Sequence, residues 1–350
     1  MRQPLAELLK NSGALKALDL YWGANRLTVL TYHRVTDATL PSFDHLRPNV
    51  SASPQQFDQQ MAYVARHFHV IDLETLENAL LRGGKLPSRP LLLTFDDGYL
   101  DNYENAFPVL KRYHLPAVIF LMTSLIGRAG LPWWDLGAYA FYHTTCTTAD
   151  LPILGTRTLN DPANPRAKQT AEREMLAAIK PLPAEQQRAT VDALFIALNV
   201  APPPAESHFM SWDQVREMAA HGVSFQPHTV NHPRISGLDQ AAAAREIEQS
   251  SREIAEHIGL PGYTARAFAY PFGLPGDYHA ETLAALRTND IRLAFTLTPG
   301  PVFRREAERH LLEIPRILIL YQDTFEVFLA KVMGIDVVRE RGKRSYVEQG

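Results

Sequence analysis

Residues 91–99 have the sequence LLLTFDDGY, in which an apolar run leads directly into two adjacent carboxylates. The first five residues are typical of a buried strand, and Asp96 and Asp97 follow where that strand would end. Two neighbouring carboxylates repel each other, and burying them is costly unless a cation or a shared proton relieves the repulsion. A bound metal ion is the relief that this pattern favours.

A second segment, residues 228–232, supplies two imidazoles four positions apart, His228 and His232. Pro227 precedes the pair and Pro233 follows it, and a residue before proline avoids helical backbone angles, so a loop after a strand is predicted. One carboxylate with two histidines makes a three-ligand site that leaves positions open for water. The two segments together predict a metal centre, whereas one histidine of the 13 in the chain would not.

Short apolar runs alternate with helical patterns along the rest of the chain, which is typical of parallel strands joined by crossover helices. So many βα units predict an α/β fold with a closed or nearly closed barrel, whose functional groups lie at the carboxyl ends of the strands. The predicted strands are 27–33, 68–72, 91–95, 117–122, 223–226, 265–270, 292–297 and 313–319. The predicted helices include 58–66, 73–82, 99–113, 211–221 and 237–258, the last with Ser236 and Asp239 as a capping box.

Residues 133–209 interrupt this alternation. They contain no good strand and several prolines, and within them 171–179 and 184–198 are predicted helices. We interpret this stretch as a helical insertion on the barrel rim, which either covers the active site and selects the substrate or is a surface decoration. The predicted division is an N-terminal helical segment (1–26), a barrel (27–322) that carries the insertion, and a C-terminal helix and tail (323–350).

Composition narrows the class of protein. The 350 residues are sufficient for a large core, and the net charge of −3, with a basic cluster only at 339–344, argues against nucleic-acid binding. The single cysteine, Cys146, excludes an intrachain disulfide and a cysteine-based zinc site. No apolar run is long enough to span a bilayer. Charges in the first ten residues argue against a signal peptide, so a cytoplasmic location is expected, with a membrane-peripheral one as the alternative, and the oligomeric state is left open.

The predicted metal centre suggests a hydrolytic chemistry. A metal held by three protein ligands keeps a water molecule whose pKa falls to about 7, and a free carboxylate beside it can act as general base. Adjacent residues at a strand end point in different directions, so Asp96 and Asp97 can divide these roles. Gly98 lets the chain turn sharply there. The alternative is that the Asp pair only caps the following helix.

Three motifs in this order, TFDDGY (94–99), HTVNH (228–232) and FAYPFG (268–273), resemble the polysaccharide deacetylase family, known also as carbohydrate esterase family 4 or the NodB-homology domain. The resemblance covers roughly residues 27–321. It implies a distorted (β/α)7 TIM-like barrel with the helical insertion, and removal of acetyl groups from N-acetylated sugars with a divalent metal, usually zinc. Carried over residue by residue, it implies that Asp97, His228 and His232 are the ligands, Asp96 is the base and Phe272 gives its backbone N–H to the oxyanion.

Some positions depart from the family pattern. Many members place before the proline motif an arginine that pairs with the catalytic Asp, and here Ala269 stands there. The Leu-x-His motif that supplies the general acid in many members is also missing. His33, at the end of the first predicted strand, is therefore our candidate for general acid or substrate contact, and the alternative is a structural histidine. Further candidates for contacts to the oxyanion or the sugar are Tyr270, Arg316 and Trp134. Alternatively, Trp134 is a packing residue and Arg316 only holds neighbouring loops together.

Two classes of function follow. The first is a metal-dependent hydrolase that removes acetyl groups from an N-acetylated polysaccharide or glycoconjugate precursor. The second is a non-catalytic carbohydrate-binding barrel, or a hydrolase of another C–N bond that uses the same metal site. Asp96 favours an enzyme, because a binding protein does not need a base.

Overall fold

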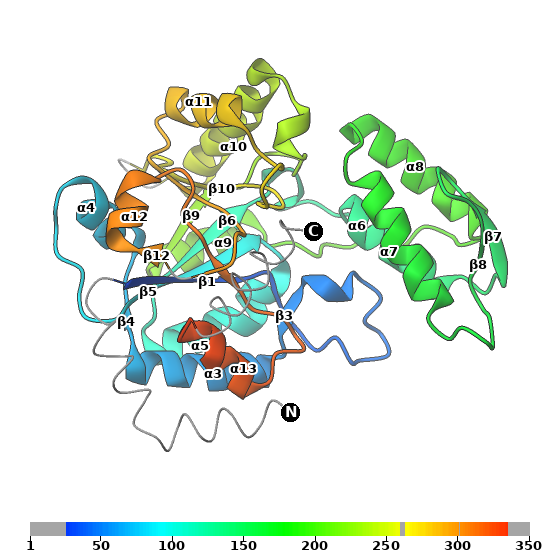
Figure 1. Ribbon diagram of the computed structural model, residues 1–350, viewed down its shortest axis with the longest axis horizontal. Coiled ribbons are helices and arrows are strands. Elements are labelled where there is room, and N and C mark those ends of the chain that lie inside the picture. The colour runs from blue at the N-terminus through cyan, green and yellow to red at the C-terminus, as the bar shows by residue number, and fades with distance from the viewer. Residues whose placement is uncertain (1–25, 260–262, 301, 335–350) are drawn as a thin grey trace, which may run out of the picture.

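The structure is an α/β fold of parallel strands and surrounding helices, which confirms the predicted fold class of a distorted (β/α)7 barrel, and its barrel strands are divided between a main sheet and the separate pair β10-β11 (Figure 1). Four of them form continuous parallel ladders in the order β1-β5-β6-β9, and β13 pairs with the other side of β1. Strands β10 and β11 pair with each other, and a parallel bridge between Phe295 and Ile314 links β11 to the segment before β13. The bounds are β1 (Arg26–Tyr32), β5 (Pro90–Asp97), β6 (Ala117–Leu121), β9 (Val223–Pro227), β10 (Ala267–Ala269), β11 (Leu293–Phe295) and β13 (Ile317–Leu318).

The Gln226 side chain connects β9 to β10, two barrel strands that form no backbone ladder with each other among the described residues. Gln226 of β9 accepts two backbone hydrogen bonds on its Oε1, from Arg266 N at 2.9 Å and from Ala267 N at 3.0 Å. The Gln226 side chain is 2% exposed, so both bonds lie away from water. A glutamine thus takes the place of backbone pairing at this point of the barrel.

Strand β5 is buried on both faces, as expected for a central parallel strand. Leu91, Leu93 and Phe95 belong to the large cluster under the outer helices, whereas Leu92 packs with the residues of the barrel interior. Thr94 and Asp96 share the face of Leu92, because side chains alternate along a strand. Asp96 is therefore directed into the barrel.

Several helices begin with a side-chain cap that fixes their start. Helix α3 begins one turn earlier than predicted, after the capping box of Ser53 and Gln56, and α9 begins after the capping box of Ser211 and Gln214. The helices outside the insertion are α3 (Pro54–His67), α4 (Leu73–Leu81), α5 (Phe107–Tyr113), α9 (Trp212–Ala220), α10 (Gln240–Ile258), α11 (Ala280–Thr288), α12 (Arg304–Arg309) and α13 (Phe325–Val332). The short strands are β2 (Arg34–Val35), β3 (Val50–Ala52), β4 (His69–Val70) and β12 (Val302–Phe303).

Two helix predictions were wrong in detail. The predicted capping box of Ser236 and Asp239 does not form: Asp239 is itself the N-cap of α10 and accepts from Ala242 N, while Ser236 donates to Gly276 O. The predicted helix 99–113 is interrupted, because a π-turn over Asn102–Ala106 precedes α5. Pro108, near the start of α5, has no N–H and fits only the first turn of a new helix.

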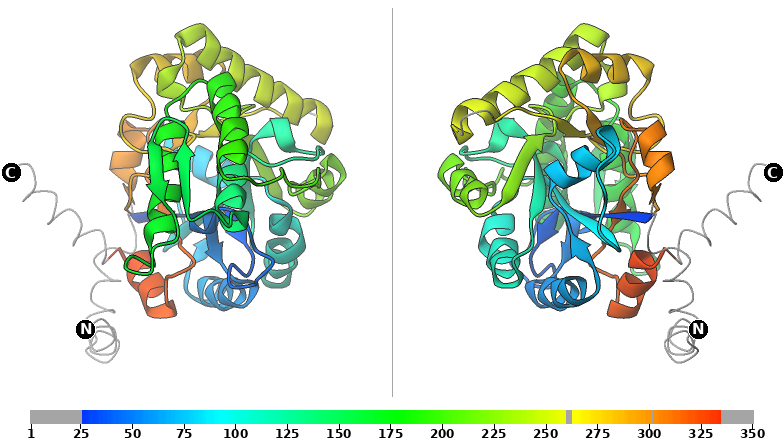
Figure 2. Two further views of the ribbon diagram at one scale, coloured as in Figure 1. Left: turned by 90° about the vertical axis from the view of Figure 1, so that its right-hand side faces the viewer. Right: turned by 90° about the vertical axis from the view of Figure 1, so that its left-hand side faces the viewer.

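The insertion has its own hydrophobic core. Helices α6 (Trp133–His143), α7 (Ala167–Ile179) and α8 (Ala184–Ala197) pack around Phe141, Met175 and Leu194. The prediction missed the antiparallel hairpin of β7 (Thr148–Leu151) and β8 (Gly155–Thr158), because four-residue strands give only a weak alternation signal. When the molecule is turned by 90°, the insertion stands in front of the barrel strands (Figure 2, left).

The structure describes residues 26–259, 263–300 and 302–334. The predicted N-terminal helical segment, except for Arg26, which begins β1, and most of the predicted C-terminal helix and tail lie outside these ranges, so the division into domains stays a prediction. Within the described ranges, the structure has no helix of the length and apolarity that crossing a membrane requires.

Candidate active site

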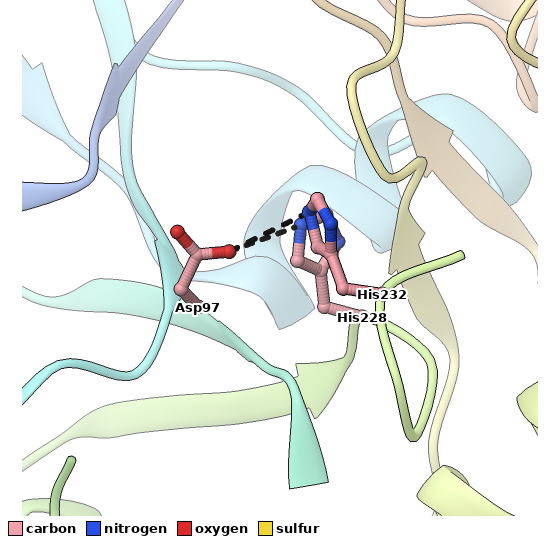
Figure 3. Close-up of side chains that lie close together, drawn as sticks. All are labelled: Asp97, His228 and His232. Atoms are coloured by element: carbon pink, nitrogen blue, oxygen red, sulfur yellow. Dashed lines mark ion pairs between the residues drawn. The ribbon is translucent and has the colours of Figure 1, made fainter. Parts of the chain in front are cut away.

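The structure brings Asp97, His228 and His232 together at the mouth of the barrel (Figure 3). Asp97 ends β5, and the two histidines lie in the loop after β9. The Nε2 atoms of His228 and His232 each lie 3.6 Å from Asp97 Oδ1. Their ligand atoms lie within 4.8 Å of one another, and all three residues are buried. It is the one cluster of this kind among the described residues.

The donor atoms fit a divalent cation. Asp97 Oδ1 is buried and has no hydrogen-bond partner in the structure. The Nδ1 atom of His228 lies 2.7 Å from Ala269 O, so it carries the proton and leaves the Nε2 lone pair free. An acceptor oxygen without a donor and an imidazole in this tautomer are what a metal ion requires.

Burial governs the protonation of the three side chains. Burial lowers the pKa of His228 to about 4, and it lowers that of His232 well below the usual value, with His228 adding to the effect. Both imidazoles are therefore neutral at pH 7. Burial, together with Asp96 and Asp135, raises the pKa of Asp97 well above its usual value. Placing a cation here would remove this penalty on the Asp97 carboxylate.

The loop that carries the histidines is held by Glu246 of α10. Its carboxylate accepts from Val230 N at 2.8 Å and Asn231 N at 3.0 Å, between the two histidines. The His232 amide in turn donates to Thr229 Oγ at 3.0 Å. These bonds fix a tight turn that places both imidazoles on the same side of the loop.

Asp96 is paired with Arg316 inside the barrel. The guanidinium donates two hydrogen bonds of 2.7 Å, from Nη1 to Oδ1 and from Nη2 to Oδ2. Arg316 is 0% exposed and also donates from Nε to Thr296 O, so it has no free face for a substrate. Burial raises the pKa of Asp96, but the opposing effect of Arg316, with His228 and His33, is larger and brings the pKa down to about 2. Asp96 is therefore ionised at neutral pH.

His33 lies beside this pair at the end of β1. Its Nε2 is 3.9 Å from Asp96 Oδ2, and its side chain is 16% exposed, whereas Asp96 is buried. Burial lowers the pKa of His33, although the Asp96 carboxylate opposes the change. His33 is thus a titratable group within reach of both the cleft and the predicted base.

The two candidates from the proline motif lie differently. Phe272 lines the cleft, and its ring packs edge-on against His232 with 4.7 Å between ring centroids. Its amide donates to no acceptor among the described residues, so the N–H is available. Tyr270, in contrast, is fully buried, donates its hydroxyl to Leu312 O at 2.8 Å and stacks on Tyr278. The structure does not bring Tyr270 to the cleft.

Trp134 forms the wall behind His232. Its ring lies 4.8 Å from that of His232, and its indole N–H donates to Tyr99 OH at 2.9 Å. Tyr99 donates in turn to Asp135 Oδ2 at 2.7 Å, and Asp135 is 0% exposed. Trp134 therefore supports a ligand side chain and has no free N–H to offer to a sugar. The sequence reasoning missed Tyr99 and Asp135 as parts of this network.

Backbone strain is concentrated around the site. Among the described residues, nine other than glycine have positive φ, and four of these belong to the cluster or border it. Such angles cost of order 1–3 kcal/mol each and persist only where the surroundings enforce them. The four residues are Asp97 (φ 73°), Thr229 (68°), His232 (54°) and Phe272 (63°).

A cleft of about 360 Å³ lies over these side chains. The polar groups of His33, Asp96 and the three clustered residues line it together with mostly apolar side chains. Part of its wall comes from the insertion, through Trp133 and Trp134 of α6 and Leu176, Ala177 and Lys180 at the end of α7. Of the two predicted roles for the insertion, the structure therefore favours the one that places it at the active site.

The sequence reasoning missed the pairing of Arg316 and the position of Lys180. A signal for Arg316 exists, because this arginine interrupts the mostly apolar segment 313–319 that was predicted as a strand. A charge inside a buried strand requires a partner of opposite charge, and Asp96 is such a partner. Lys180 gave no signal, since a lysine after a helix is usually solvated.

Comparisons with known proteins match most of the chain. The family model described as polysaccharide deacetylase matches residues 83–294, more than half of the chain. The poly-beta-1,6-N-acetyl-D-glucosamine N-deacetylase of Staphylococcus epidermidis is 26% identical over 337 residues, which are 91% of this chain and 86% of the relative.

Solved structures share the fold. The Streptococcus pyogenes deacetylase PplD in complex with acetate aligns with a TM-score of 0.59 and 20% identity, over 88% of this chain and 99% of the other. IcaB from Ammonifex degensii aligns with a TM-score of 0.54 and 21% identity, over 88% and 97%. At these identities the likeness concerns the barrel fold.

Proposed function

The chain belongs to the polysaccharide deacetylase family, and on this premise we propose how its residues remove the acetyl group from an N-acetylated sugar. The protein is a metal-dependent hydrolase of the N-acetyl amide bonds of carbohydrates. The observation that carries our assignment of roles is that the two adjacent carboxylates have different partners. Asp97 faces two neutral histidines, whereas Asp96 is held by an arginine.

Asp97, His228 and His232 would hold the divalent metal. In a three-ligand site, such a metal supplies Lewis-acid polarisation of the oxygen atoms of water and of the carbonyl group. Two histidines and one carboxylate suit zinc, and zinc is the metal we propose. With only three protein donors, the metal would keep coordination positions for water and substrate on the side that faces the cleft.

Asp96 would accept the proton of the attacking water as general base. Its pairing with Arg316 keeps it ionised and fixes the orientation of both oxygens. We assign Arg316 as a positioning residue, since it is fully buried and touches Asp96. His33 would give a proton to the leaving amine nitrogen, and its distance of 3.9 Å from Asp96 supports this role.

The Phe272 N–H would stabilise the oxyanion that forms when the amide carbon becomes tetrahedral. The support is that Phe272 lines the cleft, contacts His232 and has an amide without an acceptor among the described residues. A hydrogen-bond donor that is fixed before the reaction requires no rearrangement when the negative charge develops on the oxygen.

The proposed substrate is a polymer or oligomer of N-acetylglucosamine. The support is the similarity to the Staphylococcus epidermidis enzyme, whose name specifies such a polymer. The alternatives of a binding barrel or of another C–N hydrolase predict no release of acetate.

The test is acetate release from N-acetylglucosamine oligomers by the purified protein. We expect acetate and free amine in equal amounts, loss of activity after removal of metal with a chelator, and recovery when zinc is added. A protein that contains one metal ion per chain but releases no acetate from β-1,4- or β-1,6-linked oligomers would contradict the proposal.

A further inference from the structure

Lys180 connects the insertion to the loop that carries Phe272. The residue is the C-cap of α7, and its Nζ lies 4.1 Å from the centroid of the Phe272 ring. The same ammonium group lies 3.3 Å from Asp277 Oδ1 and 3.4 Å from Oδ2. One side chain of the insertion thus contacts both ends of the 272–277 loop. A cation over an aromatic face and an ion pair with a buried carboxylate each favour this arrangement.

The 272–277 loop needs such support at Phe272. A φ of 63° is a strained conformation for a bulky aromatic residue, and it persists only when neighbours enforce it. Behind Phe272 the chain is fixed, because Leu297 N donates to Gly273 O at 2.8 Å and Leu274 N donates to Asp277 Oδ2 at 3.1 Å. The ring itself is contacted by His232 and by Lys180.

Lys180 is itself anchored in the insertion. Gln187 of α8, which is 5% exposed, donates from Nε2 to Lys180 O at 3.2 Å and to Ile179 O at 3.4 Å. Ile179 is fully buried in the hydrophobic core of the insertion. The backbone at the end of α7 is therefore held in place, and the Lys180 side chain extends from it to the 272–277 loop.

Asp277 is shared between the insertion and the barrel. Besides Lys180, it accepts from Arg234 Nε at 3.1 Å, and Arg234 follows the loop that carries His228 and His232. The Asp277 side chain is 6% exposed, so two cations hold one buried carboxylate. Losing one cation leaves the other in place, which makes the contribution of Lys180 separable from the folding of the loop.

We propose that Lys180 is a positioning residue of the reaction, which fixes the Phe272 amide at the cleft from the insertion. This inference rests on the proposed function and adds to it a role for the insertion. A displacement of about 1 Å in such a donor is sufficient to slow a reaction by about 100-fold. The role predicts an effect on kcat, because the oxyanion exists only in the transition state.

The test compares Lys180→Met with Lys180→Arg. Methionine keeps the apolar stem but removes the charge, so kcat for acetate release should fall by about 10- to 100-fold with KM changed less than about threefold. Arginine keeps the cation and should recover kcat to within about fivefold of the wild type. Lys168→Met removes a charge from the first turn of the same helix, where Lys168 donates to Thr144 O, and should leave kcat unchanged.

A second measurement does not depend on activity. Hydrogen exchange of the backbone amides in residues 272–277 and of Leu297 should be faster in Lys180→Met than in the wild type, Lys180→Arg and Lys168→Met. Unchanged exchange in Lys180→Met overturns the inference, as does a change in KM alone. If the wild type releases no acetate, the proposed function fails, whereas the exchange result still decides whether Lys180 holds the loop.

Discussion

Arg316 is the main reason that Asp96 stays ionised in a buried position. Burial alone would raise the pKa of the Asp96 carboxyl, and the positive charge of the Arg316 guanidinium, together with its two hydrogen bonds, contributes most to reversing the direction. The folded-state pKa of about 2 lies below the ordinary value of 3.8. The resulting stabilisation is fully present above pH 3.8 and is lost as the pH falls through about 2.

Replacement of Arg316 by methionine should therefore raise the pKa of Asp96. Because a protonated carboxyl cannot act as base, the acidic limb of the pH profile of kcat/KM should move to higher pH. The free energy of unfolding should fall by about 3–5 kcal/mol, since the variant leaves a buried charge without its partner.

The matched control is Arg112→Met, which removes an exposed ion pair with Asp58. Its unfolding free energy should change by less than about 1 kcal/mol, and its pH profile should not move. An unchanged acidic limb in Arg316→Met would contradict the assignment of Asp96 as the base.

At the scale of elements, the turn after β5 depends on Gly98. Its φ is +87°, and an added Cβ would lie 2.6 Å from Leu121 Cδ2 and 2.9 Å from Ile126 Cδ1. Gly98→Ala should cost about 1–2 kcal/mol for the backbone conformation and about 1–3 kcal/mol for overpacking.

Gly222→Ala separates these two costs. Gly222 has a φ of +89°, but nothing lies within 4 Å of the added Cβ. Its free energy of unfolding in urea should fall by the backbone cost of about 1–2 kcal/mol. Equal losses in the two alanine variants would show that Leu121 and Ile126 give way freely, against our account of the turn.

Gln226 supports the contact between strands β9 and β10. Gln226→Met removes the acceptor of two backbone N–H groups at about constant volume and should destabilise the fold by about 2–4 kcal/mol. Ser224→Ala removes only the hydroxyl that accepts from Gln226 Nε2 and should cost less than about 1 kcal/mol. Denaturant unfolding measures both, and similar values would mean that the bridge contributes little.

At the scale of the whole molecule, the sequence predicts the barrel and its mouth because both follow from local patterns. Apolar runs define strands, and residues that follow them meet at one end of a parallel barrel, as Asp97, His228 and His232 do. The pairs that join distant segments are not visible locally. Arg316 and Asp96 are separated by 220 positions, and Lys180 and Asp277 by 97.

The insertion shows the same limit. Two of its three helices, α7 and α8, were predicted from periodicity and lie close to the predicted bounds, whereas α6 was not predicted. That α7 ends at the cleft depends on how the insertion packs on the barrel, which no periodicity encodes. The hairpin of β7 and β8 was missed because each strand has only four residues.

The most direct test of the division of labour between the two carboxylates is the metal content of Asp96→Asn and Asp97→Asn, measured by atomic spectroscopy alongside acetate release. We predict that Asp96→Asn keeps about one metal ion per chain and loses acetate release by at least about 100-fold, whereas Asp97→Asn loses the metal as well. Loss of metal in Asp96→Asn with retention in Asp97→Asn, or full activity of Asp96→Asn, would contradict it.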